Sequence, residues 1–167
     1  MELAATIEPL TGPLPSVAWR WDPETDILAG SFQSNRKASG LTGSIEVSDE
    51  VGSIIVLDVV NGAICGLDIV VWPEVTSVST LRVPNPLAEG RVVLPPTKGG
   101  GVDAIDIEAE LTVTANADES IFHLRMGAEE ESEVVRVADR LYLEVADGVL
   151  TGCWLTGVPP FPAGGEY

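Results

Sequence analysis

The feature that most constrains the fold of this chain is an alternation of apolar and polar residues with a period of two. The clearest example runs from Ile105 to Thr114, where five apolar residues alternate with five polar ones. Successive side chains of a β-strand point to opposite faces, so this pattern predicts one half-buried antiparallel strand. The same period recurs in 17–21, 65–71 and 135–145, and no segment has the period of a capped amphipathic helix. The sequence therefore predicts an all-β fold.

The second constraint is a similarity between the two halves of the chain. Residues 55–67 align without a gap on residues 141–153, and each segment holds an alternating strand, an Asn/Asp-Gly dipeptide and a later glycine. The dipeptides Asn61-Gly62 and Asp147-Gly148 predict type I′ hairpin turns, because both central residues of such a turn have positive φ. The sequence thus favours an internal duplication.

The similarity continues upstream, where 17–28 matches 111–122 through a short acidic turn. We therefore predict two similar antiparallel β units, a first repeat over 13–73 and a second over 105–160, joined by a connector over 74–104. A unit of about 60 residues is marginally stable alone, which favours packing of the two apolar faces against each other. The expected fold of the 167 residues is a single compact domain. We expect its two units to form a pseudo-twofold β-sandwich or flattened barrel of roughly eight to twelve strands.

The first repeat resembles a small uncharacterised bacterial β domain family. The resemblance rests on Trp21-Asp22-Pro23-Glu24-Thr25-Asp26, an aromatic-Asp-x-x-x-Asp turn before a strand, and on the later strand Gly62-Ala63-Ile64-Cys65-Gly66-Leu67-Asp68. The second repeat departs from this pattern, with Asn116 and Ser120 at the aspartate positions and Trp154 at the late acidic position. The resemblance implies a β fold and carries no activity.

The charge of the chain excludes two classes of partner. The formal net charge is −17, from 26 acidic and 9 basic residues, and Arg36-Lys37 is the only adjacent basic pair. Nucleic acids and anionic membranes are therefore not expected as partners, because both need clustered Lys or Arg. Acidity of this degree keeps a β-rich chain soluble. A basic protein partner and bound cations remain open alternatives.

The sequence also carries information on localisation and on the state of the cysteines. No apolar run approaches the roughly 20 residues of a spanning helix, and the first residues lack the pattern of a signal peptide. We expect a soluble, cytoplasmic protein. Cys65 and Cys153 are far apart in the sequence and outside any zinc-binding spacing, which predicts two buried free thiols.

Two acidic segments are candidate cation or partner sites. Asp22, Glu24 and Asp26 alternate in the turn that follows Trp21, a spacing that a cation could use. Aspartates also form turns by accepting hydrogen bonds from nearby backbone N–H groups, and this interpretation is favoured. The run 129–131 with Glu133 is the densest acidic patch, typical of a solvated loop, although a basic partner could dock there.

The remaining candidates for chemistry are few. His123 is the only histidine and is expected to be exposed on the polar face of a strand. The four tryptophans, Trp19, Trp21, Trp72 and Trp154, are expected mainly in the core, with a ligand-stacking platform as the alternative. No nucleophile elbow and no phosphate-binding loop occurs. The sequence therefore predicts no catalytic residue, no cofactor and no metal site.

These observations favour a non-enzymatic acidic β scaffold that acts as an interaction or accessory protein. A small-ligand or cation-binding module is one alternative. An enzyme that uses carboxylates in a cleft between the repeats is another. Exposed sheet edges leave a homodimer open.

Overall fold

The computed structural model describes residues 3–95, 102–127 and 131–162 of the chain. All regular secondary structure in these residues is β-strand, which confirms the all-β prediction. In this part of the chain no helix is long and apolar enough to cross a membrane. The strands are β1 (Thr6–Pro9), β2 (Arg20–Trp21), β3 (Leu28–Ser31), β4 (Thr42–Ser48), β5 (Ile54–Val60), β6 (Ala63–Val71), β7 (Val75–Ser77), β8 (Ala88–Val93), β9 (Val102–Glu108), β10 (Leu111–Ala115), β11 (Phe122–Met126), β12 (Glu133–Ala138), β13 (Leu141–Ala146) and β14 (Val149–Leu155).

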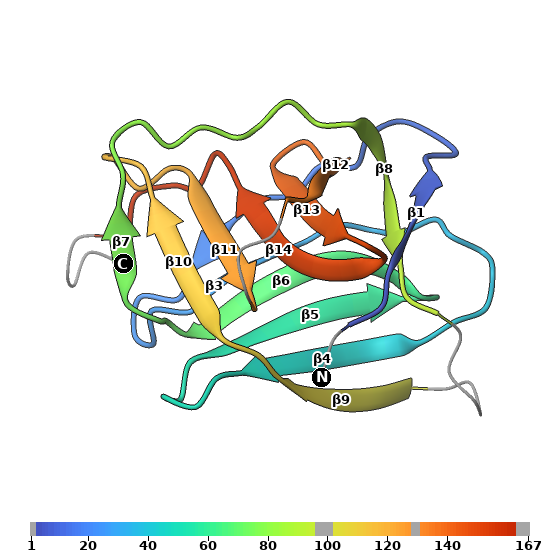
Figure 1. Ribbon diagram of the computed structural model, residues 1–167, viewed down its shortest axis with the longest axis horizontal. Coiled ribbons are helices and arrows are strands. Elements are labelled where there is room, and N and C mark those ends of the chain that lie inside the picture. The colour runs from blue at the N-terminus through green and yellow to red at the C-terminus, as the bar shows by residue number, and fades with distance from the viewer. Residues whose placement is uncertain (1–2, 96–101, 128–130, 163–167) are drawn as a thin grey trace.

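The strands form one strongly curled sheet that makes a half-barrel (Figure 1). Its main path runs β7-β10-β11-β14-β13-β12-β8-β6-β5-β4-β9. Strand β8 connects the two halves of this path, because it pairs in parallel with β12 and meets β6 at Ala63 and Val93. Strand β1 pairs with β8, and β3 extends the sheet from β6 and carries β2.

The curl places apolar faces from both halves of the sheet around one core. A single cluster of buried side chains includes Leu57 and Leu67 from β5 and β6, together with Leu124 and Leu143 from β11 and β13. Each of these four leucines is at most 1% exposed. The alternation along each strand therefore directs one face of every major strand into a shared interior.

The alternating segment 105–114 is two strands, and the prediction of one continuous strand is wrong. Strand β9 ends at Glu108 and pairs with β4, whereas β10 begins at Leu111 and pairs with β11. The Ala109 N–H donates to the Ser48 carbonyl at 3.0 Å, and the Glu110 carbonyl accepts from Gly127 at 2.8 Å. The chain thus crosses between the halves of the sheet here. The alternation continues across the break because both strands face the same core.

Both predicted type I′ turns are confirmed. Asn61 and Gly62 have φ values of 49° and 84°, and Asp147 and Gly148 have values of 49° and 73°. The turns close the β5–β6 and β13–β14 hairpins. Each hairpin has a register shift a few residues before its turn, after Asp58 in the first and after Glu144 in the second.

Two segments of the sheet have the same strand order. We call β2 to β6 the first unit and β10 to β14 the second unit; their orders are β2-β3-β6-β5-β4 and β10-β11-β14-β13-β12. The connector between them contributes β7 and β8, and both pair in parallel with the second unit, at β10 and β12. Strand β9, which lies between β8 and the second unit in the chain, pairs in parallel with β4 of the first unit.

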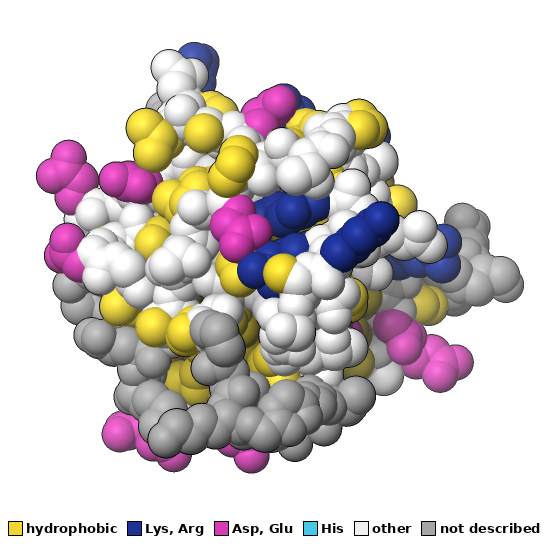
Figure 2. All heavy atoms as spheres, turned by 90° about the vertical axis from the view of Figure 1, so that its right-hand side faces the viewer, with side chains coloured by type: hydrophobic (Ala, Val, Ile, Leu, Met, Phe, Trp, Pro, Cys, Tyr) yellow, Lys and Arg dark blue, Asp and Glu magenta, His cyan; other side chains and the backbone are white. Residues whose placement is uncertain are grey.

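Basic side chains that are scattered in the sequence gather on the face formed by β1 and β8 (Figure 2). Two arginines of this face, Arg36 and Arg91, have intramolecular partners. Arg36 forms an ion pair with Glu8, with Nη2 and Oε2 3.0 Å apart, and also donates to the Asn61 carbonyl. Arg91 donates to Thr11 at 2.9 Å and to Asn35. The arginines of this face therefore hold the N-terminal segment and the loops beside it.

Candidate functional site

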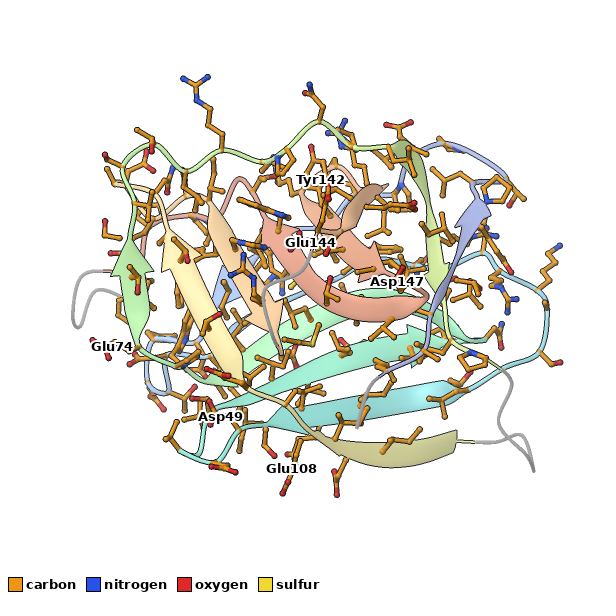
Figure 3. All side chains as sticks on the ribbon, viewed as in Figure 1. Asp49, Glu74, Glu108, Tyr142, Glu144 and Asp147 are labelled. Atoms are coloured by element: carbon orange, nitrogen blue, oxygen red, sulfur yellow. The ribbon has the colours of Figure 1, made fainter. Side chains whose placement is uncertain are left out.

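The most distinctive surface feature is an aromatic pocket with a volume of about 210 Å³. It lies at the end of the molecule marked by Glu74 in Figure 3, next to Trp72 and Val75 in the chain. The residues that line it are Trp21, Asp26, Trp72, Val75, Glu119, Phe122 and Phe161. The aromatic pocket therefore draws on both units and on the C-terminal segment.

Local chain geometry brings the four rings together. Trp21 ends β2, Trp72 follows directly after β6, and Phe122 begins β11, so each ring stands at the end of a strand. Phe161 follows a Pro159-Pro160 pair that cannot continue a strand pairing. Strand ends that meet at one edge of the curled sheet thus collect the rings at a single place.

Hydrogen bonds fix both indole rings of the aromatic pocket. The Trp21 Nε1–H donates to the Pro159 carbonyl at 2.8 Å, and the Trp72 Nε1–H donates to the Asp26 carbonyl at 2.7 Å. Each indole donor is therefore satisfied by the backbone. These hydrogen bonds within the protein hold both rings in place.

The rings of the aromatic pocket present faces in different directions. Trp21 stacks on Trp72 with centroids 5.5 Å apart and an interplanar angle of 22°. Phe161 stands edge-on to Trp21 at 85°, and Phe122 meets Trp72 at 54°. Phe122 is buried and forms the floor, whereas Phe161 is 45% exposed. The aromatic pocket is thus open to solvent above an apolar floor.

All charge on the described lining residues of the aromatic pocket is negative. Asp26 and Glu119 are exposed carboxylates from the β2–β3 and β10–β11 turns, and no Lys, Arg or His is among the described residues that line the aromatic pocket. Both residues have left-handed backbones, with φ values of 61° and 56°. The aromatic pocket therefore combines ring faces with two carboxylates, which is the composition that attracts a cation.

The acidic turn predicted as a candidate cation site acts locally as a turn. The Asp22 carboxylate accepts a hydrogen bond from the Glu24 N–H at 3.0 Å, as the favoured interpretation predicts. The Asp26 N–H donates to the Asp22 carbonyl at 2.9 Å. Over the described ranges, no group of three His, Cys, Asp or Glu side chains is placed to hold a metal ion.

A second concave region lies between the β4–β5 turn and the crossover from β9 to β10. It has a volume of about 600 Å³ and is lined by four acidic residues, Asp49, Glu50, Glu108 and Glu110, with the apolar Val51, Ala109 and Leu111. Asp49 and Glu108 lie near each other at this edge of the molecule (Figure 3). The Asp49 carboxylate accepts hydrogen bonds from the Val51 and Ser53 N–H groups, so it shapes the turn. The predicted acidic patch at 129–131 falls largely outside the described residues.

His123 is buried, and the prediction that it is exposed is wrong. Only 8% of the residue is accessible, its Nε2 forms a short contact with the Glu144 carboxylate, and its ring stacks on Trp154 with centroids 4.0 Å apart. The alternation correctly places His123 away from the main core. Glu144 on β13 and Trp154 on β14 lie beside it on the outer face and shield it (Figure 3 labels Glu144).

The burial of the tryptophans agrees with the prediction in part, and the burial of the cysteines agrees with it. Trp19 is 5% exposed and belongs to the core cluster, as predicted. Trp154 is also 5% exposed but lies against His123 on the outer face, and Trp21 and Trp72 are half-buried and line the aromatic pocket. Cys65 is buried, as predicted, and burial together with the charge of Asp58 raises its pKa to about 11. A thiol with this pKa is a poor nucleophile at neutral pH.

Asp58 is a half-buried carboxylate, and we expect Asp58→Asn to stabilise the protein at neutral pH. Burial raises the pKa of Asp58, and burial with the charge of Asp58 raises the pKa of Asp68. The folded state therefore holds the proton more tightly than the unfolded state. The destabilisation is absent below the ordinary Asp pKa of about 3.9 and develops as pH rises through the raised pKa.

Urea unfolding at pH about 3, below the ordinary Asp pKa, and at pH about 7 checks this prediction. The gain of Asp58→Asn over wild type should be roughly 0.5 kcal/mol at neutral pH, since solvent screens a half-exposed charge, and should vanish at the lower pH. A gain of equal size at both pH values would assign the effect to side-chain shape. A loss of stability at neutral pH would contradict the prediction.

The fold and the aromatic pocket together define an acidic all-β half-barrel with an open aromatic site. No protein-family model and no curated protein matches this chain.

Proposed function

We propose that this protein is a non-enzymatic interaction module that receives a cationic side chain of a basic protein partner in its aromatic pocket. The observation that carries the proposal is the convergence of Trp21, Trp72, Phe122 and Phe161 in an open pocket whose described charged lining residues are Asp26 and Glu119. Ring faces attract a cation through their quadrupoles, and the carboxylates add charge at the mouth.

The size of the aromatic pocket favours a side chain over a free metabolite. Sites for whole small molecules typically enclose roughly 300–1,000 Å³, which exceeds the 210 Å³ here. A pocket of this size suits one group that projects from a larger partner. The net charge of −17 would draw a basic partner toward the surface and disfavours nucleic acid and anionic membranes.

We also propose that the scaffold is an internal duplication, with the two units related by a pseudo-twofold arrangement. Support comes from matching registers: Leu28 pairs with Ile69 and Ile69 with Ile55, while Phe122 pairs with Leu155 and Leu155 with Leu141. Support also comes from the shared strand order, the paired type I′ turns and the register shifts after Asp58 and Glu144.

The binding proposal predicts that the double variant Asp26→Asn/Glu119→Gln weakens binding of a short Arg- and Lys-containing peptide by roughly fivefold or more. Both substitutions keep side-chain shape, and Asn tolerates the left-handed backbone of Asp26. The measurement is a fluorescence-anisotropy titration at physiological salt, with a Gln-substituted version of the peptide as the neutral probe.

The matched control is Glu50→Gln/Glu108→Gln, which changes net charge equally at the other acidic region. It should change affinity less than about twofold at this salt. Equal losses for the two double variants would mean that the peptide binds the acidic surface diffusely, and the assignment of the aromatic pocket would fall.

A further inference from the structure

We infer that the aromatic pocket selects a quaternary ammonium group, such as a trimethylated lysine side chain, over a primary ammonium or a guanidinium group. This inference rests on the proposed function and specifies the chemistry of the cation. Three properties of the aromatic pocket carry it: the supply of hydrogen-bond acceptors, the angles between the rings and the position of the carboxylates.

The first property is the place of the acceptors: apart from the exposed carboxylates of Asp26 and Glu119, the described side chains that line the aromatic pocket are apolar or aromatic, so its floor offers no side-chain acceptor. The Asp26 carbonyl already accepts the Trp72 indole N–H, and the Pro159 carbonyl accepts that of Trp21. A primary ammonium carries three N–H donors and a guanidinium five, and each donor that loses water without a new acceptor costs free energy. A quaternary ammonium has no N–H donor. It therefore loses the least hydrogen-bonding free energy when it leaves water for an aromatic site.

The second property is ring geometry. A guanidinium is planar and stacks best against flat faces, but the nearly parallel pair of Trp21 and Trp72 has centroids only 5.5 Å apart. Insertion of a planar group between two rings needs about 7 Å, twice an ordinary stacking contact. The other faces meet steeply, at 85° between Trp21 and Phe161 and 71° between Trp21 and Phe122. Faces at such angles suit a rounded cation.

The third property is the position of negative charge. Asp26 and Glu119 are exposed turn residues, while the buried floor is the ring of Phe122. The carboxylates thus attract a cation over several ångströms without requiring a direct hydrogen bond. This arrangement matches a diffuse cation whose charge is spread over methyl groups.

The test compares probes that differ in one property. Choline and 3,3-dimethylbutan-1-ol have the same shape, and only choline is charged. A peptide with trimethyllysine, the same peptide with lysine and one with arginine distinguish the type of cation. The readout is the movement of the Trp21 and Trp72 indole N–H signals in ¹H–¹⁵N spectra of the full chain, assigned with single Trp→Phe variants.

We expect choline to bind roughly fivefold or more tightly than its neutral isostere, and the trimethyllysine peptide to bind by a similar factor more tightly than the lysine and arginine peptides. Phe161→Leu keeps apolar bulk and removes a ring, so it should weaken trimethyllysine binding as much as Phe161→Ala. Phe161→Tyr should retain binding. Unchanged melting temperatures of these exposed-site variants would show that the fold is intact.

The outcomes separate the two proposals. If the lysine or arginine peptide moved the same indole signals and bound as tightly as the trimethyllysine peptide or more tightly, the preference for a quaternary ammonium group would be overturned. The proposed function would stand. Equal binding of choline and its isostere would also overturn it. If choline bound tightly but the trimethyllysine peptide bound no more tightly than the lysine peptide, the site would be assigned to a free small molecule. The inference that the cation belongs to a side chain of a partner would be overturned. Failure of every cation to move the signals would remove both proposals.

Discussion

Gly152→Ala is expected to lower the free energy of unfolding by about 3 kcal/mol. A Cβ atom at Gly152 would lie 2.5 Å from the Leu124 carbonyl oxygen and 2.8 Å from a carboxylate oxygen of Glu144. Leu124 is part of the adjacent strand β11, so its backbone cannot move without disturbing the pairing of β11 with β14. Overpacking against backbone in a tightly paired sheet accounts for an effect of this size.

Gly66→Ala should have a similar effect in the first unit. A Cβ there would lie 2.8 Å from the Gly30 carbonyl oxygen and 2.8 Å from the Asp58 carboxylate. Gly66 and Gly152 occupy matching positions, each opposite an acidic residue at a register shift. The two glycines thus share one physical reason, which agrees with the proposed duplication.

Urea unfolding followed by circular dichroism measures both variants, and Gly12→Ala is the control. A Cβ at Gly12 would make only an ordinary contact, 3.6 Å from the Asn35 side chain. Its substitution should change stability by less than about 0.5 kcal/mol. If Gly66→Ala and Gly152→Ala behaved like this control, the close approach of neighbouring strands at both sites would be contradicted.

Local sequence predicts the features that depend on backbone chemistry. Asn61-Gly62 and Asp147-Gly148 require positive φ values at adjacent positions, and few other dipeptides do so at low cost. The alternation likewise predicts which side chains enter the core. It does not reveal that the chain changes pairing partners between Ala109 and Glu110, because period two is the same in both halves of the sheet.

The aromatic pocket and the buried histidine escape prediction for a different reason. Both depend on residues from separate strands that meet only after the sheet curls. Trp72 and Phe161 each neighbour a proline at the end of an alternating segment, and this position outside the strand is the available sign that their rings leave the core pattern. For His123 the sign is Trp154, which lies opposite it on the paired strand β14; this pairing can be recognised only when the register of β11 and β14 is known.

The composition of the aromatic pocket ties binding to the joint placement of the two units. Trp21 lies in β2 of the first unit, and Trp72 directly follows β6. Phe122 and Glu119 belong to the second unit. Neither unit alone presents the rings and the carboxylates together. A duplicated scaffold would thereby acquire a site that a single copy lacks, and changes that shift one unit against the other should alter ligand affinity.

His123→Ala is the second substitution with a large expected effect, a destabilisation of about 3 kcal/mol. The side chains of His123 and Glu144 are 10% and 13% exposed, so removal of the imidazole leaves the Glu144 carboxylate shielded from water without its partner. It also removes the ring that stacks on Trp154 at an interplanar angle of 9°. Both losses act on the folded state, and thermal or urea unfolding measures their sum.

A double-mutant cycle with His123→Leu, Glu144→Leu and the double variant separates the pair from the packing. If the carboxylate is stabilised mainly by His123, the double variant should be more stable than the sum of the single effects predicts, with a coupling of about 2 kcal/mol. Because the pair is buried, this coupling should persist at high salt, unlike that of a surface ion pair. Additive effects would mean that each side chain contributes through its own packing. In that case the loss in His123→Ala would come from the His123–Trp154 stack, and the Glu144 carboxylate would not depend on His123 for its stabilisation.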